Sequence, residues 1–383
     1  MFAGIKKPGP SKLDLGLIVS DRPCAAAGTF SRNSVLSPST VSSREVIKAG
    51  KTVMGVVANS GCANCAVGPQ GLTDARETQA LAAKTIGAKQ NEMLICSTGV
   101  IGVELPMALI RKHIGTIKPA RDGGHTFARA VMTTDTRAKE IAVSFKAGAK
   151  TVTVGGCAKG AGMIHPNMAT MLAFMTTDAA VEQAFLRKTL SDAVELSFNQ
   201  IDVDMDTSTN DTVLLLANGA AENAVLKGGG AASRAFATAV GQVCEHLAKE
   251  IARDGEGAKH LIECTVDGAR SESDARVMAR SVVSSPLVKT AVYGRDPNWG
   301  RIMMAIGKTM LPLDESKIQI FVNGIQIVEA GIAIPYSVQS VVAALGEPEV
   351  FLRVSLNTGK GKGVAWGSDL TEGYVVENSA YTT

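Results

Sequence analysis

The chain has 383 residues, a hydrophobic content of 45%, a charged content of 20% and a formal net charge of +3. This length accommodates two domains, or one large domain with a smaller one appended, and the composition is that of an ordinary globular protein. The small net charge and the lack of a basic patch interleaved with aromatic residues argue against a nucleic-acid partner, whereas small anionic or zwitterionic substrates remain open.

The N-terminal residues and the cysteines favour a cytoplasmic protein. Residues 1–10 lack the apolar core of a secretory signal, and no apolar run is long enough to cross a bilayer. The seven cysteines, spread from Cys24 to Cys264, fit reduced thiols better than a disulfide framework. Because only 4% of the residues are aromatic and 39 are glycine, we expect an aliphatic core with many tight turns.

In chain order, the first part of the sequence predicts short strands and two helices. A helix is expected over residues 73–87, with Thr73 as its N-cap and Gly87 at its end. A second helix is expected to begin near Pro106, since proline suits a first helical turn. Short apolar runs between turn residues predict strands at 17–20, 52–58, 92–96 and 152–156.

The second part mixes helices with hairpins. Asp178 is expected to cap a helix that ends near Leu196, and Asn323-Gly324 predicts a hairpin with a type I′ turn. This mixture predicts an α+β fold rather than a doubly wound parallel sheet. A domain boundary is expected near residue 265, which separates residues 1–265 from residues 266–383. The remaining expected elements are a strand at 213–217, helices at 231–253 and 337–345, and a strand at 350–355.

Residues 159–174 place one hydroxyl between a bent loop and an apolar segment. Gly160, Gly162 and Pro166 shape the loop, and the apolar run that follows contains Thr170 as its one polar side chain. A threonine at such a junction becomes a nucleophile if the peptide bond before it is cut, because the freed amine can act as its base. Without its flanking residues, Thr170 would be interpreted as a core threonine in a strand.

Longer motifs follow one another along the whole chain and together resemble one family. They are Asn59-Ser60-Gly61, Ser97-Thr98-Gly99-Val100-Ile101-Gly102, Met132-Thr133-Thr134-Asp135-Thr136, the Lys159–Phe174 stretch, Asp206–Thr212, Asp254-Gly255-Glu256-Gly257-Ala258, Tyr293–Arg301 and Asn378–Thr383. In this order they resemble the ornithine acetyltransferases of arginine biosynthesis, also called glutamate N-acetyltransferases. The resemblance implies a self-processing, N-terminal-nucleophile-like layered fold, with helices packed around mixed β-sheets and a smaller C-terminal α/β domain.

The resemblance also implies an activity. Such proteins cut themselves between the residues that correspond to Ala169 and Thr170, which here would give an α chain 1–169 and a β chain 170–383 that stay associated, as a dimer of αβ pairs. The new N-terminal threonine takes an acetyl group from N-acetylornithine and passes it to glutamate by a ping-pong route. Some members also accept acetyl-CoA as donor, and no further cofactor or metal is expected.

Roles for individual residues come with the resemblance. Thr170 is both the nucleophile and part of the substrate site, while the Thr98 hydroxyl and the Gly99 N–H stabilise the oxyanion of the tetrahedral intermediate. Lys159 is expected to pair with the substrate carboxylate and Glu256 with the ornithine δ-ammonium. The remaining matched substrate-binding residues are Thr133, Asn378 and Thr383, so the C-terminal tail is expected to fold back over the site.

Each of these residues has a plainer explanation when it is considered alone. Lys159 would be a solvated loop lysine, Glu256 a carboxylate at a helix end, and Thr98-Gly99 an ordinary turn after a strand. The matched motifs favour the functional roles. His165 is assigned to the loop, because the amine of the nucleophile makes a second base unnecessary.

Three other patterns have competing explanations. Cys62 and Cys65 have redox or zinc spacing, but no second pair follows, so a structural role is favoured over a redox module. The acidic residues between 202 and 211 lack the glycine and distal glutamate of a calcium loop. The segment from Arg295 to Arg301 is expected to form a structural turn. The alternative function is a self-cleaving aminopeptidase or amidohydrolase with water as the acceptor.

Overall fold

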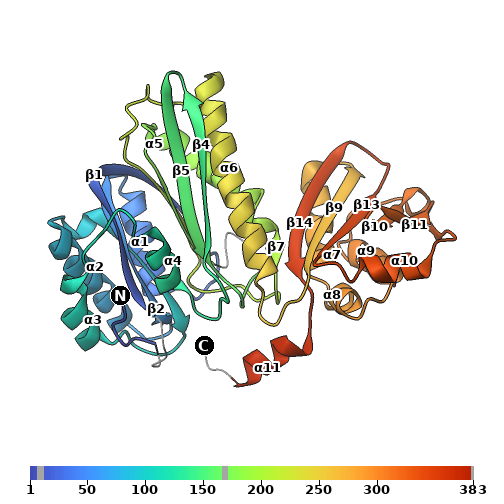
Figure 1. The fold of residues 1–383 in the computed structure, drawn as a ribbon, viewed down its shortest axis with the longest axis horizontal. Coiled ribbons are helices and arrows are strands. Elements are labelled where there is room, and N and C mark those ends of the chain that lie inside the picture. Colours follow the sequence, from blue (N-terminus) through green and yellow to red (C-terminus); the bar gives the residue numbers. More distant parts are fainter. Residues whose placement is uncertain (7–12, 166–170, 381–383) are drawn as a thin grey trace. The chain divides into compact units, whose positions relative to one another are not determined.

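The computed structural model describes residues 1–6, 13–165 and 171–380. Within them the chain forms two compact units (Figure 1). The first unit holds Met1–Asn199 and Asp206–Leu247, and the second holds Gln200–Met205 and residues 248–380. The expected boundary near residue 265 falls inside strand β9 (Leu261–Ala269), which pairs with strands that come later in the chain.

The first unit is built on one sheet, and its long first strand, β1, belongs to both halves of that sheet. The N-terminal half of β1 pairs with β2, and its C-terminal half, from Ala25 to Phe30, pairs with β8. A bulge between Val19 and Cys24 separates the two halves, and such bulges bend a strand. The strands, in sheet order, are β3 (Met93–Val100), β2 (Val53–Cys62), β1 (Leu15–Phe30), β8 (Thr212–Ala217), β6 (Leu172–Thr177), β5 (Lys150–Lys159) and β4 (Lys139–Ala147).

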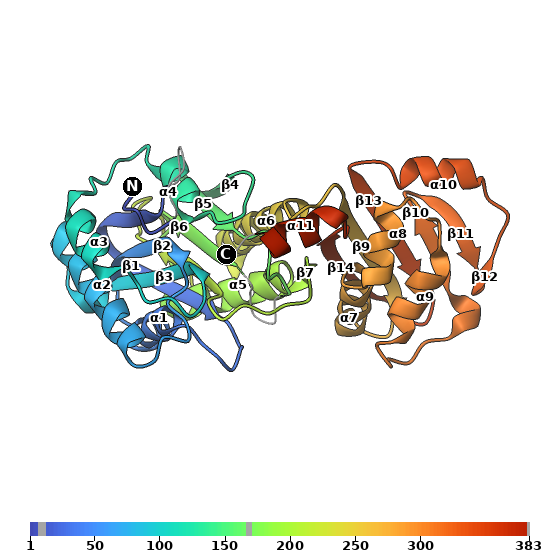
Figure 2. The same cartoon turned by 90° about the horizontal axis from the view of Figure 1, so that it is seen from below.

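Helices cover the outer faces of this bent sheet. Figure 2 shows α1, α2 and α3 gathered around β2 and β3, and Val57 and Ile95 of these strands share a buried cluster with α2 and α3. On the other half, Cys244 of α6 contacts Met175 of β6 at 3.6 Å. The inner faces of both halves meet in one cluster that includes Phe127 of α4. The helices are α1 (Pro38–Lys48), α2 (Gln70–Ile86), α3 (Met107–His113), α4 (Gly124–Val131), α5 (Gln183–Glu195) and α6 (Gly230–Arg253).

The second unit is a mixed sheet whose buried residues pack with α7, α8 and α9. Its first strand, β7 (Ile201–Asp202), comes from the short segment that interrupts the first unit and pairs with β14. The strands, in sheet order, are β12 (Ile332–Ala333), β11 (Ile325–Glu329), β10 (Gln319–Val322), β13 (Glu349–Ser355), β9 (Leu261–Ala269), β14 (Gly361–Ser368) and β7. The helices are α7 (Glu272–Val283), α8 (Pro286–Tyr293), α9 (Trp299–Gly307), α10 (Val338–Ala344) and α11 (Glu372–Ala380). Short 3₁₀ turns in the two units are Gln90–Glu92, Ile114–Thr116, Phe198–Gln200 and Glu315–Lys317.

The α+β fold predicted from the sequence is confirmed by these helices and mixed sheets. The hairpin turn at Asn323-Gly324 has the positive φ angles of a type I′ turn, 45° and 82°. Two predicted helix starts are wrong. α2 begins at Gln70, so Thr73 lies inside it. α5 begins at Gln183, because the Asp178 carboxylate accepts the Thr153 N–H instead of capping a helix.

The cysteines give no support to a redox module. All seven are buried free thiols. Burial raises the pKa of Cys62, whose Sγ lies 3.0 Å from the Val103 carbonyl oxygen, so this thiol is not activated as a thiolate. Among the residues that the structure describes, no group of three or more His, Cys, Asp or Glu side chains could hold a metal ion, and no helix is long and apolar enough to span a membrane.

Candidate active site

Thr98 and Gly99 lie at the C-terminal end of β3, where that strand pairs in parallel with β2. Thr98 is the register partner of Ser60, and Gly99 is the partner of Gly61. Gly99 has a φ of 127°, and a Cβ there would overlap the backbone of Gly61 and Cys62. Any side chain at this position would therefore push the two strand ends apart. β3 continues through these residues to Val100, so the plain explanation of a turn after the strand is wrong.

Buried asparagine side chains hold this end of β3 through hydrogen bonds. Asn210 Nδ2 donates to the carbonyl oxygens of Ser97, at 2.8 Å, and Ala63, at 2.6 Å. Ser97 Oγ in turn donates to Asn59 Oδ1 at 2.6 Å. Asn59, Ser97 and Asn210 are all buried, so each hydrogen bond is protected from competing water. The peptide that leads into Thr98 is thereby fixed in orientation.

Lys159 is the last residue of β5 and is brought directly to this strand end. Its side chain is only 8% exposed, and its Nζ donates to Thr98 Oγ1 at 3.4 Å. The explanation of Lys159 as a solvated loop residue is therefore wrong. Burial follows from the pairing of Lys159 with Leu172, which places the lysine inside the sheet rather than in the loop.

Thr133 is connected to the end of β5 through the carboxylate of Asp135, a residue to which the matched motifs assign no role. The Thr133 N–H donates to Asp135 Oδ2 at 2.9 Å, and the Gly160 N–H donates to Asp135 Oδ1 at 2.7 Å. Asp135 thus joins the turn that carries Thr133 to the residue that follows Lys159. A signal was present in the sequence, since Asp135 lies within a matched motif that also contains Thr133.

The connection between β5 and β6 carries the predicted cleavage site. Because Lys159 pairs with Leu172, the connection between the two strands comprises residues 160–171. Ile164 forms a bridge with Thr207, and Thr207 Oγ1 donates to the His165 backbone oxygen at 3.0 Å, so His165 lies in the loop after β5. The predicted nucleophile and cut, Ala169 and Thr170, lie outside the described residues, as does Thr383.

Glu256 and Asn378 come together in the second unit. Asn378 Nδ2 donates to Glu256 Oε2 at 2.8 Å, and Glu256 is 8% exposed. This proximity depends on Gly257, where a Cβ would overlap the backbone of Gly373 and Tyr374 at the start of α11.

The surroundings of Glu256 favour a positive charge. Partial burial, followed by repulsion from Glu256 and Asp254, raises the pKa of Glu377 on α11. Carboxylates that repel each other in this way are stabilised by a nearby cation, which is the charge expected of an ornithine side chain. The described part of the second unit therefore contains an acidic corner in which the Asn378 amide donates to Glu256.

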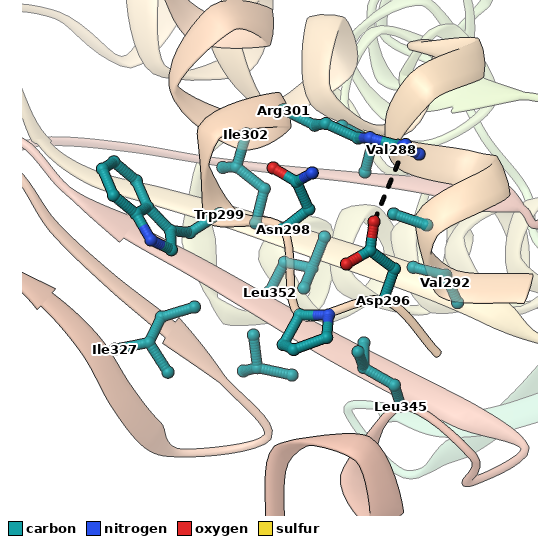
Figure 3. Close-up of a pocket in the computed structure, with 13 residues that line it drawn as sticks. Val288, Val292, Asp296, Asn298, Trp299, Arg301, Ile302, Ile327, Leu345 and Leu352 are labelled. Carbon is teal, nitrogen blue, oxygen red and sulfur yellow. Dashed lines mark ion pairs between the residues drawn. The ribbon is translucent and has the colours of Figure 1, made fainter. Parts of the chain in front are cut away.

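The segment from Arg295 to Arg301 connects α8 to the first turn of α9, and its structural role stays a prediction. Figure 3 shows its side chains around a small pocket lined mainly by apolar residues of the second unit. Asn298 is the N-cap residue of α9, and the Arg301 guanidinium lies 3.6 Å from the Asp296 carboxylate. Trp299 packs on the buried core of this unit. These contacts account for the motif within its own unit.

Comparison with known proteins identifies close relatives. The ArgJ family model matches residues 1–383. Proteins named arginine biosynthesis bifunctional protein ArgJ from Dehalococcoides mccartyi and Symbiobacterium thermophilum are 45% and 48% identical, covering 100% of this chain and 94% and 95% of their own. A crystal structure of the ArgJ protein from Bacillus halodurans aligns with a TM-score of 0.53 at 42% identity, covering 54% of this chain and 97% of that one.

The close approach at Gly99 leads to a first prediction. Gly99→Ala should lower the kcat/KM for acetyl transfer by roughly 10²-fold or more, because the displaced strand end would misplace the N–H that is expected to stabilise the oxyanion. The measurement is kcat/KM on purified protein whose fold is checked by circular dichroism. Gly124→Ala is the matched control, since a Cβ at Gly124 meets no atom within 4 Å. Equal activity of Gly99→Ala and the control would contradict the assignment of this strand end to the active site.

Proposed function

This chain belongs to the ArgJ family, and we propose that it is a glutamate N-acetyltransferase that moves the acetyl group of N-acetylornithine to glutamate. The observation that supports this best is the contact of 3.4 Å between Lys159 Nζ and Thr98 Oγ1. It brings a buried ammonium to a hydroxyl donor and a glycine N–H, at the point where the chain enters the segment with Thr170. A cation beside an oxyanion site suits an acylated amino acid with a free carboxylate.

The first half-reaction acylates Thr170. Its Oγ attacks the acetyl carbonyl carbon while its own α-amine, with a reference pKa near ~8, accepts the hydroxyl proton. The oxyanion of the tetrahedral intermediate would be held by the Thr98 hydroxyl and the Gly99 N–H. When the intermediate collapses, the C–N bond of the amide breaks, the proton passes to the departing α-amine, and ornithine leaves an acetyl ester on Thr170.

The second half-reaction runs the same steps in reverse with a different amine. The α-amine of glutamate attacks the ester carbon, the bond to Thr170 Oγ breaks, and the hydroxyl recovers its proton as N-acetylglutamate is released. Both amino acids carry an α-carboxylate, so Lys159 and Thr133 can serve both halves of the cycle. Acetyl-CoA would enter as a donor in place of N-acetylornithine, with a thiol as the leaving group.

The two substrates differ at the ends of their side chains. Glu256, buried beside Asn378, supplies the negative charge that the ornithine δ-ammonium requires. Partial burial, followed by repulsion from Glu256 and Asp254, raises the pKa of Glu377, and a bound ammonium would offset the repulsion. Thr383 is proposed to complete the substrate site from the C-terminus.

Self-processing has to precede catalysis, because only a cut before Thr170 creates the α-amine. Hydrolysis of the Ala169–Thr170 bond consumes one water and gives chains 1–169 and 170–383. Strands β5 and β6, which flank the cut, stay paired within one sheet, so the two chains remain together after cleavage. We further propose a dimer of such pairs in the cytoplasm.

The function is tested by following the fate of the acetyl group. Purified protein incubated with N-acetylornithine and glutamate should form N-acetylglutamate and ornithine in equal amounts, because the ester on Thr170 is intercepted by an amine. Mass spectrometry of both products is the measurement, with a parallel reaction that contains acetyl-CoA and glutamate. Release of acetate without N-acetylglutamate would instead indicate a hydrolase of the same self-cleaving type.

Processing is tested on a denaturing gel. The wild-type protein should give two bands, whose masses exceed that of the intact chain by one water in total. Thr170→Ala should give a single full-length band, because no hydroxyl remains to start the cleavage. Active wild-type protein that consists of one intact chain would rule out the proposed nucleophile.

The Glu256 carboxylate is tested by removing its charge. Glu256→Gln should raise the KM for N-acetylornithine by roughly tenfold or more, since a hydrogen bond between charged groups is worth about 1.5–3 kcal/mol. The KM for glutamate should change much less, because glutamate has no side-chain ammonium. Glu347→Gln, an exposed carboxylate in the same unit, is the control. An unchanged KM for N-acetylornithine would remove Glu256 from the substrate site.

A further inference from the structure

A buried carboxylate, Asp135, lies behind the proposed acyl site. The side chains of Asp135 and Lys139 are both 0% exposed, and Lys139 Nζ donates to Asp135 Oδ1 at 2.6 Å. The same Oδ1 accepts the Gly160 N–H, and Oδ2 accepts the Thr133 N–H. Both carboxylate oxygens are thereby engaged, by donors from residues 133–139 and by the backbone of Gly160.

The carboxylate is charged in spite of its burial. Burial alone would raise the pKa of Asp135, but the positive charges of Lys139 and Lys159, together with the donated hydrogen bonds, hold it below its usual range. An anion that is buried and ionised makes strong, directional hydrogen bonds with the N–H groups aimed at it. Its partners are therefore fixed more tightly than neutral hydrogen bonds would fix them.

These partners connect the residues that the proposed function assigns to the substrate. Thr133 is positioned by the hydrogen bond that its own N–H donates to Asp135. Lys159 directly precedes Gly160, whose N–H donates to Asp135, and its ammonium is attracted by the charge of that carboxylate. Lys159 then extends the arrangement to Thr98 Oγ1. A single carboxylate thus connects the turn before β4 with the end of β5.

We propose that Asp135 is the positioning residue of the acyl site, which holds Thr133 and Lys159 in the geometry that receives the substrate carboxylate. The inference depends on the proposed roles of these two residues. Asp135 itself touches no substrate. Lys139 balances its charge, which allows the anion to remain in the interior.

A role in stability alone is the competing explanation, and the arrangement argues against it. A buried ion pair often adds little net stability, since the desolvation of both charges offsets their attraction. If charge balance were the only purpose, the Lys139–Asp135 pair would be sufficient. The carboxylate also binds two backbone N–H groups, one from each segment that carries a proposed substrate ligand.

The test is a cycle of three variants: Asp135→Asn, Lys139→Met and the double variant. Each is measured for thermal unfolding, for the fraction of self-cleaved chain, and for kcat and KM with N-acetylornithine. Asp135→Asn alone leaves Lys139 facing a neutral amide and is expected to lower the melting temperature. The double variant removes both charges together and should recover most of that loss.

The KM separates positioning from stability. In the double variant, KM should remain raised by roughly tenfold with kcat changed less than about threefold, because substrate ligands are displaced while the nucleophile is not. Lys139→Met leaves the Asp135 side chain and both backbone N–H donors in place and should alter KM less than about threefold. Recovery of wild-type KM in the double variant, or equal KM effects of the two single variants, would overturn the proposal.

A parallel measurement distinguishes this inference from the proposed function. Lys159→Met should raise the KM for N-acetylornithine by at least as much as the double variant. If Lys159→Met leaves KM unchanged, the substrate role of Lys159 is wrong and the inference fails with it. If Lys159→Met raises KM and the double variant does not, the proposed function stands and only the role of Asp135 is wrong.

Discussion

The first unit depends on the double pairing of β1. One strand is hydrogen-bonded to β2 along its first half and to β8 along its second half, so it joins the two halves of the sheet. The bulge between the halves turns the sheet on itself, and the inner faces close on one apolar cluster. A bent continuous sheet of this kind gathers strand ends that lie far apart in the sequence.

The site uses this gathering of strand ends. The end of β3 carries Thr98 and Gly99, and the end of β5 carries Lys159. Parallel pairing with β2 aligns Gly99 with Gly61, and only glycine fits where the two backbones approach. The side-chain amide of Asn210, which lies two residues before β8 begins, then hydrogen-bonds the carbonyl oxygen of Ser97. Because a backbone donor has no rotamers, the Gly99 N–H at this strand end is held in one orientation, as the proposed oxyanion role requires.

Local sequence signals predicted the elements whose boundaries are set locally. The long helix expected at residues 231–253 is α6, since its apolar periodicity is strong. Gly87 ends α2 in the left-handed conformation, with a φ of 72°. The Asp178 cap failed because a short polar side chain serves equally well in a turn, and tertiary contacts decide which role it takes. Strand β4 and helices α7–α9 are not among the predicted elements, although Ser271 caps α7 and Pro286 lies in the first turn of α8.

The site was predictable residue by residue only where a matched motif named it, and its electrostatics were not predictable at all. Nothing beside Lys159 in the sequence indicates burial; the glycines that follow it favour a solvated loop. Pairing with β6 buries the lysine, and a second lysine, Lys139, is buried on the neighbouring strand β4. Two ammonium groups brought into one interior require a compensating anion. The need for the Asp135 carboxylate at this point therefore arises from how β4, β5 and β6 pair. That pairing cannot be read from the local sequence.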